Sequence, residues 1–196
     1  MIDNNIKQFC MRWICKADGY TEETIEDVFD RFFSLFVAYN TLYSEITIML
    51  EKKNMHKGTG DRVSATKNMP IYIGQAILFD KLKNLSDDID KIVNLIKNGT
   101  FYISTTRNNI TPDTVKDNKY MNNIENINSS QNLANKTKFN EAVLSLIYGV
   151  RCNIFHGKKD LQSKQIDLLV PMNNILEMII KELLLNDDKE LIYEKR

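Results

Sequence analysis

Apolar residues recur every three or four positions along TEETIEDVFDRFFSLFVAYNTLYSEITIMLEKK, residues 21–53. This spacing predicts an amphipathic helix of about eight turns, with Thr21 as its N-cap and an acidic first turn. The apolar positions are Ile25, Phe29, Phe32, Phe36, Tyr39, Tyr43, Ile46 and Leu50. Because this face is wide and aromatic, we expect the helix to be the central one of a bundle.

Other stretches have helical spacing or helix start and stop signals. The predicted helices span residues 6–16, 70–83, 86–97, 138–155 and 163–185. Pro70 suits a first helical turn, Ser86 is the expected N-cap of its helix, and Pro171 should kink the last helix or start its regular part. The polar, glycine-containing stretch 54–69 is predicted to be a loop.

The region before the helix at 138–155 lacks a helical pattern. TFYIS, residues 100–104, is strand-like but has no obvious partner strand. Residues 105–137 hold nine asparagines, one proline and few apolar anchors, which predicts a long, flexible, irregular insertion. A neutral explanation of the asparagines is that biased codon usage fills a tolerated loop. The predicted fold is all-α, a single helical-bundle domain over residues 1–196 with this insertion.

Composition limits the classes of function. The chain has 196 residues, 43% of them hydrophobic, and 26 basic residues balance 26 acidic ones. Such a chain is globular and has no overall excess of positive charge, so any contact with nucleic acid must be local. We expect a cytoplasmic protein, because no signal peptide or membrane span is recognisable.

The cysteines and histidines are sparse, and no spacing among them suits a metal. Cys10, Cys15 and Cys152 are typical of a reducing compartment rather than of a disulfide framework. Cys10 and Cys15 are five residues apart and do not share a helix face. We therefore expect no metal and no cofactor. HKGTGD, residues 56–61, lacks the frame of a phosphate-binding loop and is interpreted as an ordinary loop.

The stretch RCNIFHGKK, residues 151–159, is the strongest candidate for chemistry. On a helical wheel, Arg151 points from the middle of the apolar face, among Leu144, Ile147, Tyr148, Ile154 and Phe155. An unpaired guanidinium buried there would cost several kcal/mol. Two interpretations stay open: the stem of Arg151 lies along the core and its head reaches a partner, or Arg151 lies at a cleft or subunit interface.

His156 also has two interpretations. Gly157 ends the helix, so the chain can turn His156 toward Arg151, or a two-fold dimer can bring the paired groups around one cleft, with Asn153 orienting the imidazole. Alternatively, His156 only interacts with the helix dipole. A thiolate–imidazole pair of Cys152 and His156 is a further, minor possibility.

The pattern Arg151-Cys-Asn153-Ile-Phe-His156-Gly, an R-x4-H motif ending an apolar helix, resembles the signature of HEPN domains. FDRFFSLFVAYNTLY, residues 29–43, resembles the long aromatic helix of Apea-like members. The resemblance covers residues 21–53 and 138–185. It implies an antiparallel helical bundle that dimerises with its two motifs facing one cleft and, in active members, metal-independent RNA cleavage.

The same resemblance implies roles for the motif residues. His156 would move a proton to or from the 2′-hydroxyl or the leaving 5′-oxygen, Arg151 would stabilise charge on the phosphoryl oxygens, and Asn153 would position one of them. The family often has its polar residue directly after the arginine, where this chain has Cys152. The position of Asn153, two residues after the arginine, thus departs from the family pattern.

Positive charge gathers after the motif. Residues 151–164 contain four basic residues, Arg151, Lys158, Lys159 and Lys164, and one acidic residue, Asp160. This local excess of positive charge suits binding to a phosphate backbone and equally suits a solvated helix end. The resemblance to HEPN domains therefore implies an RNA endonuclease of bacterial defence or toxin–antitoxin systems, with an antitoxin or defence protein as its expected partner. The alternative is a catalytically silent HEPN-like module that binds RNA, a nucleotide or a protein.

Overall fold

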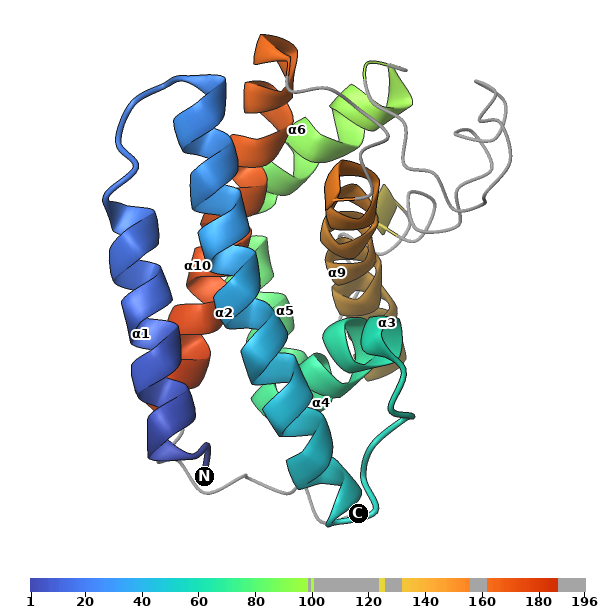
Figure 1. The fold of residues 1–196 in the computed structure, drawn as a ribbon. Helices are drawn as coiled ribbons and strands as arrows, with labels where there is room; N and C mark the ends of the chain where they lie inside the picture. Colours follow the sequence, from blue (N-terminus) through green and yellow to red (C-terminus); the bar gives the residue numbers. More distant parts are fainter. Residues whose placement is uncertain (99, 101–123, 126–131, 156–161, 187–196) are drawn as a thin grey trace.

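The long aromatic helix α2, Ile25–Glu51, is the centre of the molecule. The structure is a computed structural model that describes residues 1–98, 100, 124–125, 132–155 and 162–186, without the side chains of residues 153, 155 and 186. In Figure 1, α2 lies between α1, Asn4–Asp18, and α9, Leu133–Phe155. It packs against α1 and against α10, Ile166–Asn186.

Every regular element formed by the described residues is a helix, so the all-α prediction is confirmed for them. The remaining elements are α3 (Asp61–Val63), the π-helical turn η1 (Ser64–Asn68), α4 (Met69–Ile73), α5 (Gln75–Lys83), α6 (Ser86–Lys97) and the 3₁₀ turn η2 (Ser163–Gln165). In this part of the chain, none of the helices combines the length and apolar character that crossing a bilayer requires.

The apolar pattern of α2 predicted its buried face correctly. Phe32, Phe36, Tyr39 and Tyr43 are at most 2% exposed, and neighbouring rings along this face meet edge-on or tilted, as aromatic pairs prefer. The predicted N-cap was wrong. The helix begins one turn later than expected, because the Oγ1 of Thr24, rather than Thr21, accepts a hydrogen bond from the backbone N–H of Asp27 at 3.2 Å.

The loop predicted for residues 54–69 ends at Gly60, and helix follows from Asp61 onward. Three of the polar residues that suggested a loop, Ser64, Thr66 and Asn68, are buried. The side-chain amide of Asn68 donates to Thr47 Oγ1 at 3.0 Å and to the Gly58 carbonyl at 2.9 Å. The Tyr39 hydroxyl donates to the carbonyl of Ala65 at 2.5 Å. Because these bonds satisfy the polar groups, the segment can pack against α2.

The single helix predicted for residues 70–83 is two helices, α4 and α5, with Gly74 between them. Gly74 has φ +98°, a conformation that side chains other than glycine rarely adopt. The helix at 86–97 has the predicted bounds, but Ser86 is its first residue and Leu85 stands at the N-cap without a side-chain hydrogen bond. Pro171 lies buried inside α10.

The helix α9 starts at Leu133, five residues before the predicted start and inside the stretch expected to be irregular. The side chain of Asn132 accepts a hydrogen bond from the N–H of Ala134 at 2.8 Å and so begins the helix. Its first turns pack on α5, where the ring centroids of Phe79 and Phe139 lie 5.1 Å apart. The strand-like residues 101–104 and most of the predicted insertion lie outside the described residues.

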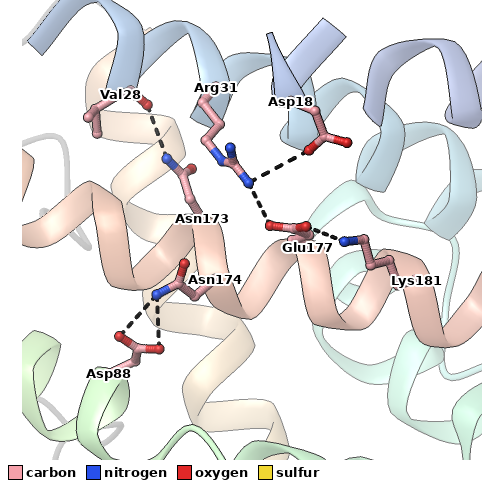
Figure 2. A network of polar contacts seen from close by, with 8 residues as sticks. All are labelled: Asp18, Val28, Arg31, Asp88, Asn173, Asn174, Glu177 and Lys181. Atoms are coloured by element: carbon pink, nitrogen blue, oxygen red, sulfur yellow. Dashed lines mark hydrogen bonds and ion pairs between the residues drawn. The ribbon is translucent and has the colours of Figure 1, made fainter. Parts of the chain in front are cut away.

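Polar contacts join α10 directly to α2 and α6, and Arg31 of α2 links the same network to α1 (Figure 2). Asn173 donates to the backbone carbonyl of Val28 at 3.1 Å. The carboxylate of Glu177 accepts from Arg31 at 2.7 Å and also binds Lys181, and Arg31 lies 3.8 Å from Asp18. Asn174 reaches Asp88 on α6. These bonds fix the register of α10 against α1, α2 and α6.

Candidate functional site

The residues predicted from the motif are only partly within the described structure. Arg151 is half-buried on α9, near its C-terminal end, and Lys164 is exposed in η2. Asn153 belongs to α9, but its side chain lies outside the described residues. His156, Lys158 and Lys159 lie outside them as well. The expected approach of His156 to Arg151 is therefore still a prediction.

Arg151 lies on the apolar side of α9, as its position on the helical wheel predicted. Leu144 and Ile147 on the same helix are at most 2% exposed. The guanidinium carbon lies 5.2 Å from the centroid of the Phe36 ring on α2, and Nη1 lies 4.0 Å from the sulfur of Cys152. A cation over an aromatic face gains about 0.5–2 kcal/mol, more when water is excluded. The guanidinium thus has an aromatic floor.

A second group of polar side chains lies one helical turn before Arg151. The carboxylate of Asp61, the first residue of α3, accepts two phenolic hydrogen bonds. Tyr43 of α2 donates to Oδ1 at 2.5 Å, and Tyr148 of α9 donates to Oδ2 at 2.6 Å. We call Asp61, Tyr43 and Tyr148 the Asp61 bridge. It joins α9 to two consecutive elements, α2 and α3, that lie far from it in the sequence.

The Asn40 side chain also contacts the Tyr43 hydroxyl. A phenol carries one proton, so its two acceptors compete for it. The carboxylate of Asp61 is the stronger acceptor because it is charged. The bond from Tyr43 to Asp61 is therefore the stronger of the two contacts.

Both tyrosines of the bridge are held in the protonated form. Burial raises the pKa of Tyr43, and the hydrogen bond to Asp61 raises it further, while the positive charge of Arg151 acts in the opposite direction. Burial and the hydrogen bond to Asp61 likewise raise the pKa of Tyr148. A protonated phenol can donate, so both bonds to the carboxylate persist through the neutral pH range.

Sequence analysis missed the Asp61 bridge. Asp61 was assigned to an ordinary loop, and Tyr43 and Tyr148 were counted only as apolar positions. One signal was present: a tyrosine on the buried face of a helix needs an acceptor for its hydroxyl. With two such tyrosines on different helices, a carboxylate in the connecting segment is a natural candidate for that acceptor.

The segment that carries Asp61 is also basic. Its cationic side chains are all exposed: Lys52, Lys53, Lys57, Arg62 and Lys67. Asp61 is the one carboxylate within residues 52–67, and it is engaged by the two phenols. Although the whole chain has no net charge, this segment presents positive charge beside the helix of Arg151.

Comparisons with known proteins found no match to this chain: none among protein-family models, none among curated proteins and none among solved structures. Within the described residues, no three His, Cys, Asp or Glu side chains are grouped so that they could hold a metal ion.

Proposed function

We propose that this protein is a metal-independent RNA endonuclease of the HEPN type, acting in bacterial defence or as a toxin. The observation that carries the proposal is the position of Arg151. It is half-buried near the end of α9, its guanidinium lies over Phe36, and it stands five residues before His156. The spacing of Arg151 and His156 is that of the R-x4-H motif.

A guanidinium in such a place suits phosphate chemistry. Its planar fork can bind two phosphoryl oxygens at once. The Phe36 ring shields one face of it from water, and hydrogen bonds to ionic groups strengthen where water is excluded. A surface arginine would bind a phosphate more weakly, because solvent and salt screen it.

His156 supplies the proton transfer in the proposed reaction. The 2′-hydroxyl of the substrate loses its proton and attacks the adjacent phosphorus, and the bond from phosphorus to the 5′-oxygen breaks. The leaving 5′-oxygen takes up a proton, and the other product ends in a 2′,3′-cyclic phosphate. An imidazole titrates near neutral pH and can perform either transfer. Arg151 stabilises the charge that develops on the phosphoryl oxygens, and Asn153 positions one of them.

Lysines and arginines near the motif would hold the RNA backbone. The proposed contacts are Lys158, Lys159 and Lys164 after the motif, together with the exposed cations of residues 52–67. Each phosphate contact releases counterions, so RNA binding should weaken as salt rises. Because the whole chain has no net charge, these local cations supply the positive charge that binding to RNA needs.

RNA cleavage in EDTA tests the proposal. His156→Ala should lower the cleavage rate by about 10²–10⁴, the usual contribution of a positioned acid–base group. Arg151→Lys should also be damaging, because a point charge cannot reproduce the bidentate fork. His56→Gln changes the other histidine of the chain and serves as the control, with an unchanged rate.

The nature of substrate and product makes the test specific. An RNA with a 2′-deoxy sugar at the scissile position should resist cleavage. Equal cutting of DNA, or activity lost in EDTA and restored by magnesium, would contradict the mechanism. RNA binding without cleavage by the wild-type protein would favour the catalytically silent module instead.

A further inference from the structure

Two contacts join α9 to α2 near the motif. Arg151 lies over Phe36, and Tyr148 is linked to Tyr43 through Asp61. Tyr148 and Arg151 are three residues apart and share a face of α9, and Phe36 and Tyr43 are seven apart and share a face of α2. The two contacts therefore connect the same two helices at positions about one turn apart along α9.

Long side chains make this connection. The backbone of α9 packs mainly against α5 and η1 rather than against α2. Arg151 consequently reaches α2 by the length of its own side chain, and Tyr148 is linked to α2 only through Asp61 of α3. Because a long side chain can adopt several rotamers, the position of Arg151 over Phe36 depends on the rotation of the turn of α9 that carries it.

We infer that Asp61 is a positioning residue for Arg151. The inference rests on the proposed function for its consequence in catalysis. Asp61 accepts one hydrogen bond from each helix, on separate carboxylate oxygens. Hydrogen bonds to a charged acceptor are roughly twice as strong as neutral ones, so the bridge fixes both tyrosine side chains. With Tyr148 fixed, the turn of α9 that carries Arg151 keeps one rotation relative to Phe36.

Asp61 acts through Tyr148, and a catalytic role is not assigned to it. It stands on α3, the first short helix after the basic loop, and so also ties residues 52–60 to the same turn of α9. Substrate bound along that loop would meet an Arg151 whose position is set by the same carboxylate. Loss of the bridge should therefore affect the rate of reaction more than the binding of RNA.

Asp61→Asn is the primary variant. The amide oxygen can still accept a phenolic hydrogen bond, but the charged acceptor is lost. We expect kcat for RNA cleavage to fall roughly 10–10²-fold, in line with the cost of small misplacements of a reacting group, with a smaller change in KM. Asp88→Asn is the matched control, because Asp88 is also a hydrogen-bonded carboxylate but lies on α6 against α10.

A double-mutant cycle separates positioning from simple loss of stability. If Asp61 acts through Arg151, then Asp61→Asn should cost little more in a chain that already carries Arg151→Lys. Tyr148→Phe removes one donor of the bridge and should show a smaller effect with the same non-additivity. It serves as the second variant if Asp61→Asn folds poorly. Full additivity of both variants with Arg151→Lys would overturn the inference.

Labelling of Cys152 gives a measurement that does not depend on activity. Cys152 is half-buried beside the guanidinium of Arg151, so a loosened turn of α9 should expose its thiol. Asp61→Asn should label faster at Cys152 and at an unchanged rate at the exposed Cys15, while Asp88→Asn should match wild type at both. Unchanged labelling at Cys152 in Asp61→Asn would contradict the positioning role.

The two proposals can fail separately. If His156→Ala cleaves RNA as fast as wild type, the proposed function falls, and Cys152 labelling alone decides the role of Asp61. If His156→Ala is inactive while Asp61→Asn keeps both wild-type kcat and wild-type labelling, the proposed function stands and the positioning role is refuted.

Discussion

At the scale of single residues, the cysteines show how burial changes reactivity. Cys10 is fully buried, its thiol donates to the backbone carbonyl of Ala38 at 3.6 Å, and burial raises its pKa to about 11. Cys15, one turn and a half further along α1, is exposed. Because the thiolate is the reactive form, the two sites should differ strongly toward alkylating reagents.

We expect an alkylating reagent at neutral pH to modify Cys15 first and to leave Cys10 intact until the protein unfolds. Mass spectrometry of peptides after timed labelling, with and without denaturant, measures this. Cys15→Ser provides the control, since it should remove the fast phase alone. Rapid labelling of Cys10 in the native protein would show that α1 opens readily from α2.

Residue-scale prediction succeeded where the information was local. The half-burial of Arg151 followed from its place on a helical wheel, because neighbours three and four residues away define the face. Asp61 could not be found in the same way. Its two partners are 18 and 87 residues away in the sequence, and nothing short of the folded chain brings them together.

At the scale of elements, Gly74 divides α4 from α5. Its φ of +98° is strained for any residue with a side chain, and an added Cβ would lie 3.4 Å from Ile77. Gly74→Ala should therefore lower the free energy of unfolding by about 1–3 kcal/mol. Gly60→Ala is the control, because Gly60 has an ordinary φ of −66° and open space around its Cβ position. Urea denaturation of both variants measures the difference.

The contacts of α10 give a pH prediction. Burial acts to raise the pKa of Glu177, but hydrogen bonds and charges from Lys181 and Arg31 outweigh it, so the pKa is lowered on balance. A carboxyl whose pKa is lower in the folded state adds stability above its unfolded pKa of about 4.3. That stability is lost as the pH falls through the folded value.

Glu177→Gln should thus cost most stability near neutral pH and progressively less as the pH falls below about 4. Free energies of unfolding measured across this range test the expectation. Glu22→Gln, which changes an exposed carboxylate in the turn before α2, is the control variant. A constant difference between wild type and Glu177→Gln at all pH values would mean that the charge of Glu177 contributes nothing to the packing of α10.

Helix boundaries could be predicted where the hydrophobic periodicity agreed with the residues that signal the start and the end of a helix, as in α6. They failed where tertiary contacts override local preference. Residues 61–68 look like a loop because they are polar, yet Ser64, Thr66 and Asn68 are buried in a helical turn against α2. The burial of Asn68 is tolerable because its side-chain amide bonds Thr47 of α2, and the Thr66 hydroxyl bonds the carbonyl of Arg62. Sequence periodicity carries no information about such partners.

At the scale of the whole molecule, the fold class and the central role of α2 followed from composition and periodicity. The candidate site followed only in part, because its arginine comes from one helix, its aromatic floor from another and its carboxylate from the segment between α2 and α4. Three-dimensional arrangement of this kind is set by packing geometry. The local sequence predicts which face of each helix is buried, but it does not predict which other helix packs against that face.

Dimerisation is the remaining expectation at this scale. A half-buried guanidinium near the end of α9 suits a subunit interface, and a two-fold axis would bring the same groups of both chains to one cleft. Light scattering at micromolar concentration should give twice the 22.8 kDa of one chain. His156→Ala should keep this mass, since a polar group at a helix end contributes little to an apolar core.

Mixing two impaired variants tests whether the cleft is shared. A mixed dimer of Arg151→Lys and His156→Ala chains carries one intact arginine and one intact histidine around the same cleft. If the two motifs act together across the axis, the mixture should recover a measurable fraction of wild-type cleavage that neither variant has alone. Recovery should require subunit exchange, so covalently cross-linked homodimers of each variant should fail to complement. A wild-type protein that is monomeric yet fully active would rule out the composite site, because each chain would then carry out the reaction with its own Arg151 and His156.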